Sequence, residues 1–582
     1  MISITPGMTP RIHGAPGLPG RHSTPMRIAR CTFLALAVFT IPGARAQTPT
    51  DAGGLQQQQQ RTLEYYELQK RLGERPTDDG GLIDDQTTKP AVPKAPAAEA
   101  RVRVNKVTTN ASQILTPAEI EAITSTLVDR DVTIKELFEA VAAINESYKA
   151  KGCATCQAFL PPQKVAGGIV EIRLVEGALS AVRVEGANYI REGFILDRIH
   201  ARPGEVLDVK ALEKDLAFIN NTNDFKTAAS LKPGASFGTV DAVIRALEPP
   251  RFGLTLFGDN AGRDETGRNR TGLIFNARSV FGVSDPLTIS ASGSEGALAG
   301  SVGYSLPVNR WGTRIGMQYD SSAIDIRSGP FAKLDITGTA SNAGLTLTQP
   351  LIAENQLRLN VFGGYNTKDS ITKFAGSPIT RADTRAFSLG FDAQRFTGQG
   401  FWYTRQVVTS GTTSYAGDSD FIKYNADALW TENFRGGVTT VVRGSFQLSN
   451  EPRLPTFEQF FLGGMATVRG YPEGLLIGAR GYFVSGELQF PLLGGRAASP
   501  GAPAGSDRLR GVMFIDHGGV IPGGITGSHF GWTDTLTSAG TGLLYNFSRY
   551  LNGRVMLGFP LAERGTAPRD WVAHVYVQAI LF

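Results

Sequence analysis

From residue 251 to the end of the chain, apolar and polar residues alternate with the period of two that is typical of β-strands. Clusters of Gly, Asn, Asp and Ser separate segments of about ten residues, the length that a tilted strand needs to cross a bilayer. The segment Trp571–Phe582 shows the alternation most clearly. One face of this segment carries Ala573, Val575, Val577, Ala579 and Leu581, and the other carries His574, Tyr576, Gln578, Ile580 and Phe582.

A soluble β-sandwich would alternate in the same way, so two architectures fit this pattern. We expect a transmembrane barrel over residues 250–582, because the segments have bilayer length and no apolar stretch is long enough for a helical span. At roughly 20 residues per strand and turn, this region holds about 16 antiparallel strands. Unpaired backbone groups in hydrocarbon cost several kcal/mol each, so a complete last strand suits closure. Phe582 is accordingly the expected insertion signal for the machinery that assembles barrels.

Residues 101–249 mix helical and strand periodicity and predict two α+β units in series, 101–177 and 178–249. Thr116 and Pro117 mark a helix start, because a hydroxyl cap and a proline suit the first helical turn. Apolar residues continue at helical spacing at Leu127, Ile134, Leu137, Val141 and Ile144. Strands are expected at 168–177, 181–186 and 240–248, and further helices at 188–199 and 209–220.

Residues 47–100 predict one helix followed by a flexible linker. Apolar residues recur at helical spacing between Gln56 and Leu72, whereas Pro76, Pro90, Pro93, Pro96 and a Gly-Gly pair follow. A single helix on a long tether has no local core against which to pack. It therefore either docks elsewhere in the protein or frays.

Residues 1–46 have the order of a secretory signal peptide. The apolar run 31–41 follows Arg27 and Arg30 and precedes a small-x-small exit at 44–46, although a short core helix is the alternative. Met26 fits as a start codon as well as Met1 does. The segment holds five arginines and no acid, so the remaining chain has 53 basic and 53 acidic residues. The net charge therefore gives no reason to expect nucleic acid as a partner.

Two cysteines remain after the signal segment, Cys153 and Cys156. A redox C-x-x-C usually opens a helix after a strand, whereas this pair stands between Lys151-Gly152 and Pro161-Pro162 and resembles a loop. We expect a structural disulfide or idle thiols in an oxidising compartment rather than a catalytic pair.

Enzymatic chemistry finds little support in the sequence. The six histidines are scattered, and neither a Gly-x-Ser-x-Gly elbow nor a phosphate-cradling Gly-Lys-Ser/Thr loop occurs. We therefore expect no catalytic residue, no metal and no cofactor, and an outer-membrane hydrolase is the weakest of the alternatives.

Residues 455–474 resemble the signature of two-partner (type V) secretion transporters, the hemolysin and adhesin secretion-activation family. Its central residues are Val468, Arg469, Gly470 and Tyr471. Downstream, the family's pattern of Phe, Asp and Gly is matched by Phe514, Asp516 and Gly518, and Leu306-Pro307 resembles a strand end of the family. The resemblance extends over nearly the whole chain that follows the signal segment.

This resemblance implies a 16-stranded barrel, two periplasmic POTRA domains at 101–177 and 178–249, and a plug helix at 56–72. The loop that bears Arg469 is expected to fold into the lumen, where Arg469 would meet Asp516 through a bidentate guanidinium–carboxylate pair. Gly470 would permit a tight turn, and Tyr471 would supply packing area. The alternative is that Arg469 is one solvated loop charge among many.

The implied function is export of an unfolded exoprotein, an adhesin or a hemolysin, across the outer membrane of a Gram-negative bacterium without nucleotide hydrolysis. The POTRA domains would bind the client, and outer-membrane lipid and the barrel-assembly machinery would be further partners. A barrel-assembly factor of the same superfamily and a passive porin are the rival functions. The sequence names neither the client nor the oligomeric state.

Overall fold

The computed structural model describes residues 51–71, 82–86 and 101–582, apart from residues 152, 154, 237, 330, 416, 495–506, 522–533, 549 and 562–569. The expected signal segment and most of the linker lie outside the described residues. None of the described helices is both long and apolar enough to cross a membrane.

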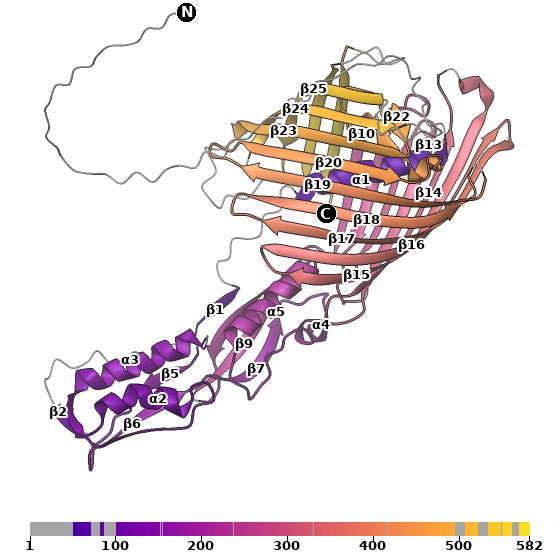
Figure 1. Ribbon diagram of the computed structural model, residues 1–582. Helices are drawn as coiled ribbons and strands as arrows, with labels where there is room; N and C mark the ends of the chain where they lie inside the picture. The colour runs from indigo at the N-terminus through magenta and orange to yellow at the C-terminus, as the bar shows by residue number, and fades with distance from the viewer. Residues whose placement is uncertain are drawn as a thin grey trace, which may run out of the picture. The chain divides into compact units, whose positions relative to one another are not determined.

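Residues 252–580 form a closed antiparallel barrel of sixteen strands (Figure 1). The first half consists of β10 (Phe252–Asp259), β11 (Arg270–Ala277), β12 (Leu287–Ser294), β13 (Ala297–Pro307), β14 (Arg314–Asp325), β15 (Ile336–Ala353), β16 (Leu357–Phe374) and β17 (Ser377–Phe396). The second half consists of β18 (Gly400–Thr413), β19 (Ser419–Asn433), β20 (Thr439–Ser449), β23 (Arg480–Gly494), β24 (Asp507–Ile521), β25 (Asp534–Asn546), β26 (Leu551–Pro560) and β27 (Val572–Ile580). The predicted 16-stranded antiparallel barrel is confirmed.

The last strand closes the barrel by pairing with the first, with Thr255 opposite Ile580. The backbone carbonyl of Phe582 extends this seam by accepting from the amide of Leu254 at 3.1 Å. In β27, His574 is buried while Val575 and Val577 are exposed. The alternation thus places polar residues inside and apolar residues outside, where lipid can cover them.

Several strands are longer than the expected ten residues. Both β15 and β16 have 18 residues, and β17 has 20. About ten residues suffice to cross the hydrocarbon layer, so these hairpins extend beyond it. The alternation of residues that identifies a strand continues beyond the membrane boundary. The alternation therefore sets no upper limit on the length of a strand.

The first unit, residues 101–177, has two helices beside short strands. Its elements are β2 (Arg101–Val104), β3 (Lys106–Thr109), α2 (Pro117–Thr124), η1 (Ser125–Leu127), β4 (Arg130–Thr133), α3 (Ile134–Ala150), β5 (Gln157–Phe159) and β6 (Ile169–Val175). Thr116 caps α2 as expected, but the apolar spacing does not continue one helix from Leu127 to Ile144. Asp129 has a φ of 62°, and the strand β4 separates the two helices.

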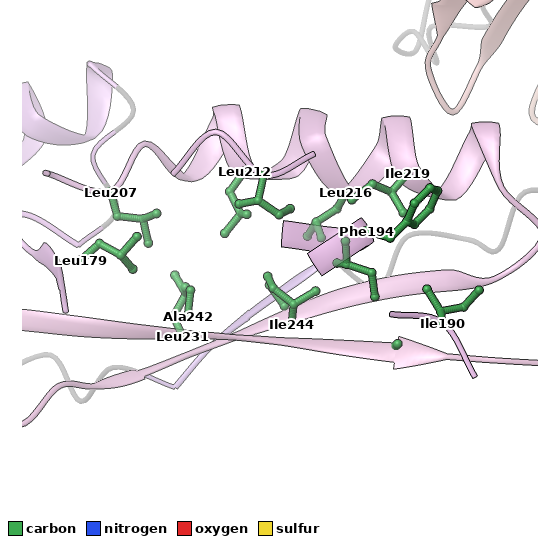
Figure 2. Packing of buried hydrophobic residues seen from close by; sticks show 14 of the residues in the cluster. Leu179, Ile190, Phe194, Leu207, Leu212, Leu216, Ile219, Leu231, Ala242 and Ile244 are labelled. Carbon is green, nitrogen blue, oxygen red and sulfur yellow. The ribbon is translucent and has the colours of Figure 1, made fainter. Parts of the chain in front are cut away.

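The second unit, residues 178–249, packs a helix on a sheet. Its elements are β7 (Ala178–Glu185), α4 (Glu192–Leu196), α5 (Val209–Thr222), β8 (Lys226–Pro233) and β9 (Thr239–Leu247). Figure 2 shows Leu212, Leu216 and Ile219 of α5 turned toward Leu231 and Ile244 of the sheet, which together form a buried core.

The helix expected at 188–199 is shorter in the structure, where α4 runs only from Glu192 to Leu196. The carboxylate of Glu248 accepts hydrogen bonds from the backbone amides of Asn188, Tyr189 and Ile190. These amides therefore have hydrogen-bond partners without forming a helix. The strand β8 was not predicted, because its residues alternate small and polar side chains with few bulky apolar ones.

The linker contains one ordered element that the sequence analysis missed. Residues Ile83–Asp85 form the strand β1, which pairs in parallel with β8 and extends the sheet of the second unit to the order β1-β8-β9-β7. The flexible linker expected within residues 47–100 is therefore ordered at Ile83–Asp85. A three-residue strand leaves too short a pattern to be recognised.

Candidate functional site

A 30-residue loop joins β20 to β23 and is almost entirely buried. It contains the turn η3 (Thr456–Glu458) and the hairpin strands β21 (Phe460–Leu462) and β22 (Leu476–Gly478), which pair with each other. Gly463 and Gly464 follow β21 with φ values of 104° and 101°, which L-residues with side chains rarely adopt. The loop packs through its own apolar cluster against Phe483, Val520 and Leu536 of the barrel wall.

Arg469 stands at the centre of this loop and is fully buried. Its Nε and Nη2 donate to the two carboxylate oxygens of Asp516 on β24, at 2.9 and 2.8 Å. The backbone amide of Arg469 donates to the same carboxylate at 3.0 Å. The sequence-derived pair is thus brought together, and both of its side chains are inaccessible to solvent.

Three further side chains complete the surroundings of the guanidinium. Its Nη1 donates to Glu487 at 2.7 Å, and its Nη2 donates to Ser485 at 3.1 Å, both on β23. The ring of Phe514 lies 3.5 Å from the guanidinium carbon, in a cation–π contact. The buried positive charge therefore faces two carboxylates and an aromatic face, which is the compensation that a desolvated charge requires.

The backbone around Arg469 touches the barrel wall directly. Its carbonyl accepts from Nε2 of His574 at 2.8 Å, and the amide of Gly470 donates to Ser538 at 3.1 Å. A Cβ placed on Gly558 would lie 2.4 Å from the carbonyl oxygen of Arg469. Glycine at 558 therefore permits this approach, because any side chain there would displace the loop backbone.

The remaining motif residues pack the loop in place. Val468 and Tyr471 are buried in the loop cluster, and the Tyr471 hydroxyl donates to the carbonyl of Thr537 at 3.1 Å. A Cβ on Gly518 would lie 2.6 Å from a methyl group of Leu462 in β21. Each predicted motif residue therefore contacts either the loop or the wall on which it rests.

A second set of charges fixes the start of the loop. Glu458 in η3 is buried and accepts from Lys368 of β16 at 2.7 Å and from Lys423 of β19. Both lysines lie on strands that precede the loop in the chain, whereas Glu487 and Asp516 lie on strands that follow it. The loop is consequently attached to the wall by separate ion pairs at Glu458 and at Arg469.

The helix α1 (Ala52–Arg71) lies inside the barrel (Figure 1). It begins four residues before the expected Gln56, because Asp51 accepts the amide of Gly54 and so caps its first turn. Ala52 and Leu55 pack against Ala297, Ile324 and Ala340 on the inner wall.

Other described contacts of α1 are both apolar and polar, and Tyr65 packs in a buried cluster with Phe257, Met465 and Tyr576. Gln60 donates to Asp320 at 3.1 Å, and Ser322 donates to the carbonyl of Ala52 at 3.2 Å. Arg61 lies over the ring of Phe460, 4.5 Å from its centroid. The hydrogen bonds among these contacts are ones that water can replace when the helix leaves.

A shared hydrogen-bond partner also joins this helix to the loop of Arg469, in addition to the stacking of Arg61 on Phe460. Gln58 donates to the Glu473 carboxylate at 3.2 Å and accepts from Arg263 at 2.6 Å. Glu473 also accepts the backbone amide of Met465 at 2.6 Å. Since Glu473 lies four residues after Arg469, the helix and the loop share a hydrogen-bonded side chain.

The other predicted residues lie away from this site. Cys153 and Cys156 form a disulfide in the first unit, before β5, with their Cα atoms 5.4 Å apart. The Phe582 side chain is exposed at the end of the barrel seam. Among the described residues, no group of three or more His, Cys, Asp or Glu side chains is placed to hold a metal ion.

Sequence reasoning missed Ser485, Glu487, Ser538 and His574 as parts of the site. A signal was present for two of them, because Ser485 and Glu487 occupy the polar face of the alternating strand β23. The structure aligns Ser485, Asp516, Ser538 and Pro560 as direct neighbours on four successive strands. That alignment depends on strand register, which a single strand's pattern does not encode.

The closed barrel, its filled lumen and the α+β units before it define an outer-membrane β-barrel transporter of the POTRA-containing class. Residues 238–543 match the model for haemolysin secretion/activation protein ShlB/FhaC/HecB, and residues 102–177 match the POTRA domain of ShlB type. The chain belongs to the haemolysin secretion/activation family. It is therefore an outer-membrane protein whose POTRA region lies in the periplasm.

Individual relatives agree with this assignment. The outer membrane transporter CdiB of Escherichia coli is 25% identical over 514 residues, which cover 82% of this chain and 84% of that protein. The heme/hemopexin transporter protein HuxB of Haemophilus influenzae is 22% identical over 399 residues, covering 64% of this chain and 69% of that protein. The solved structure of CdiB from Escherichia coli superposes with a TM-score of 0.63 at 21% identity, covering 93% of this chain and all of that one.

Proposed function

We propose that this protein binds an extended exoprotein in the periplasm and passes it through the barrel after α1 has left the lumen. The observation that carries the proposal is the nature of the contacts that hold α1. Gln58 and Gln60 are held by side-chain hydrogen bonds, and water can replace these bonds when the helix leaves. An immovable core helix would instead bury a continuous apolar face.

The buried pair of Arg469 and Asp516 holds the loop in the arrangement that permits passage. Its neighbours Glu487 and Ser485 fix the guanidinium in one orientation, and Gly558 allows the loop backbone to rest on the wall. The pair thus acts as a latch between one loop and the strand β24. Removing Arg469 would take the hydrogen-bonded cation away from Asp516 and Glu487, and removing Asp516 would leave the guanidinium with Glu487 as its one hydrogen-bonded carboxylate.

The units at 101–177 and 178–249 bind the client, and we infer that the second is also a POTRA domain. Both present strands at sheet edges, which can accept an extended polypeptide by β-augmentation. The exoprotein is of the adhesin or hemolysin kind, in keeping with the match to haemolysin secretion/activation proteins. Lipid covers the outer barrel face, and the barrel-assembly machinery inserts the protein.

Two rival functions fit the site less well. A passive porin needs an open lumen, whereas here a helix and a buried loop occupy it. A barrel-assembly factor would come from the same superfamily, but the family match over 238–543 is to secretion and activation proteins. Export without catalysis requires no nucleophile set, and folding of the client outside the cell supplies a driving force.

The test compares the culture medium of the native Gram-negative cell with that of a strain that lacks this gene, by quantitative mass spectrometry. At least one large polypeptide should be present in the medium only when the gene is intact. Restoring the gene should restore that polypeptide, while the abundance of other outer-membrane barrels stays constant. An unchanged medium would overturn the proposal, and a general loss of outer-membrane barrels would favour the assembly function.

A further inference from the structure

Tyr65 of α1 lies against the barrel wall beside the closing seam and is 4% exposed. It packs against Phe257 of β10, Tyr576 of β27 and Met465 of the loop that bears Arg469. The rings of Phe257 and Tyr576 stack on each other across the seam, with their centroids 6.3 Å apart. The first strand, the last strand and the loop therefore jointly hold one aromatic side chain of the helix.

Two arginines of the barrel wall face the same ring. The guanidinium carbon of Arg443 on β20 lies 4.6 Å from the ring centroid of Tyr65, and that of Arg554 on β26 lies 5.2 Å from it. The strands β23, β24 and β25 separate β20 from β26, so the two cations approach the ring from different parts of the wall. Both distances lie within the range of cation–π attraction, which is about 6 Å. We call the following residues the Tyr65 site: Phe257, Arg443, Met465, Arg554 and Tyr576.

The arginines of the Tyr65 site are also held by contacts within the barrel itself. Arg443 lies 4.9 Å from the ring centroid of Phe483, and its Nη1 donates to the carbonyl of Ala466 at 2.6 Å. Arg554 lies 5.7 Å from the ring centroid of Tyr576. These contacts do not involve α1, so they remain when the helix leaves. The vacated site therefore keeps its two cations in position.

Arg443 has a further donor that a ligand could use. This residue is 6% exposed, and its Nη2 has no hydrogen-bond partner among the residues that the structure describes. A buried N–H group without an acceptor is costly, and an incoming chain that brings an acceptor would remove that cost. An extended polypeptide carries a carbonyl group at every residue. The site therefore offers contacts both to a ring and to the backbone beside it.

We propose that the Tyr65 site binds aromatic side chains of the client during passage, and that Tyr65 occupies the site in the resting protein. The inference rests on the proposed function, because the site opens only after α1 has left the lumen. An aliphatic side chain would pack against the rings but offers the arginines no π face, whereas an acidic one would pair with the arginines but pack poorly. Phenylalanine, tyrosine and tryptophan meet both requirements. A client ring in the site also excludes Tyr65, so it opposes the return of α1 while the client is in transit.

Small probes test the site in the full-length protein in planar bilayers. The probe is N-acetyl-tyrosine amide, and N-acetyl-leucine amide is the uncharged control without a π face. A ring bound in the site holds α1 out of the lumen, so the tyrosine probe should lengthen large channel openings as its concentration rises. Two cation–π contacts correspond to a roughly fivefold difference in affinity, so the leucine probe should need a roughly fivefold higher concentration. Equal effects of the two probes, including no effect of either, would overturn the proposal.

The variant Arg554→Gln tests whether an arginine of the site recognises the ring. Its response to the tyrosine probe should fall toward its response to the leucine probe. Arg405→Gln is the matched control, because Arg405 lies over the ring of Phe362 at 4.2 Å and is not part of the Tyr65 site. Its response to the probes should equal that of the native protein. An unchanged preference for the tyrosine probe in Arg554→Gln, measured on barrels that migrate as folded on gels, would contradict the assignment.

Two substitutions of Tyr65 test its role as the resting occupant. Tyr65→Phe keeps a ring between the two arginines, whereas Tyr65→Leu keeps only apolar volume. Large openings should be roughly fivefold more frequent in Tyr65→Leu than in Tyr65→Phe, because the leucine lacks both cation–π contacts. Equal frequencies would show that the arginines do not recognise a ring at this position, and the proposal would fail.

A disulfide that joins α1 to the wall separates this inference from the function on which it rests. A Cβ on Gly338 would lie 3.4 Å from the Cβ of Ala52, so Ala52→Cys with Gly338→Cys can form this bond. Oxidation of this variant should abolish large openings and, with them, the effect of the tyrosine probe. If large openings persist after oxidation, α1 is not the plug and the proposed function fails. If oxidation closes the channel but the two probes act alike on the reduced protein, only the inference about the Tyr65 site fails.

Discussion

Arg469 binds Asp516 with its side chain and its backbone at once. Two guanidinium nitrogens and the main-chain amide all donate to one carboxylate, at distances between 2.8 and 3.0 Å. The amide contact fixes the loop backbone on β24, while the fork fixes the side chain. Position and charge are therefore specified together, which a lysine at this position could not reproduce.

Replacing Arg469 by Ala should abolish secretion and leave an inserted barrel. Asp516 and Glu487 would then be two buried carboxylates without their hydrogen-bonded cation, a loss of about 3–5 kcal/mol to the bound loop. Asp516→Asn should act in the same direction. Export is measured as exoprotein in the medium, and insertion as the heat-modifiable mobility of the folded barrel on gels.

Arg453 provides a matched control in the same loop, because its side chain is 62% exposed and pairs only at 3.8 Å with Glu451. Arg453→Ala should secrete normally, since exposed pairs contribute about 0–1 kcal/mol. Normal export by Arg469→Ala would show that secretion does not need the pair of Arg469 and Asp516.

Gly558→Ala should weaken the seating of the loop without touching any charged group. The added methyl group would lie 2.4 Å from the carbonyl oxygen of Arg469, and overpacking of this kind costs about 1–3 kcal/mol. Gly303→Ala on β13 is the control, because no atom lies within 4 Å of its added Cβ. The temperature at which the folded gel band disappears should fall for Gly558→Ala and stay constant for Gly303→Ala. Equal temperatures would show that the loop does not rest on Gly558.

The barrel and the latch could be predicted from the sequence to different extents. The strand alternation identifies the barrel because the lumen and the lipid impose opposite polarity on successive residues. Arg469 and Asp516 were found through a family resemblance, and no pattern in the chain alone would pair two residues 47 positions apart. Glu487 lies on the polar face of the alternating strand β23, but that strand's pattern does not reveal its pairing with Arg469.

Sequence patterns could not predict the short strand β1 or the polar first part of the helix α1. The strand β1 has three residues, too few for the two-residue alternation of a strand to repeat. The start of α1 at Ala52 depends on capping by Asp51. The glycines and glutamines that follow show no apolar residues at helical spacing. Both features are set by contacts with distant residues, Ala229 in one case and Ala340 in the other.

Acidification should loosen the helices of the first unit. A hydrogen bond from Lys151, with those from Thr116, lowers the pKa of Glu119 to about 2. The amide of Thr133, with Arg130, lowers the pKa of Glu136 to about 2. Both values lie below the ordinary 4.5, so these carboxylates stabilise the folded unit above about pH 4.5. That stabilisation disappears as the pH falls through about 2.

Hydrogen–deuterium exchange, corrected for its intrinsic pH dependence, measures this effect in the full-length protein. Amide protection across α2 and α3 should decline between about pH 4.5 and pH 2. Glu136→Gln should remove the part of this decline that belongs to α3 and leave that of α2. Protection that is constant across this interval would contradict the assigned hydrogen bonds.

If α1 must leave the lumen before the client passes, a disulfide that holds α1 in place should stop export. A Cβ on Gly338 would lie 3.4 Å from the Cβ of Ala52, close to the separation of disulfide-linked cysteines. The variant Ala52→Cys with Gly338→Cys can therefore lock the helix to β15. Exoprotein release should stop when this disulfide forms and resume on reduction. Undiminished release with the disulfide fully formed would contradict it.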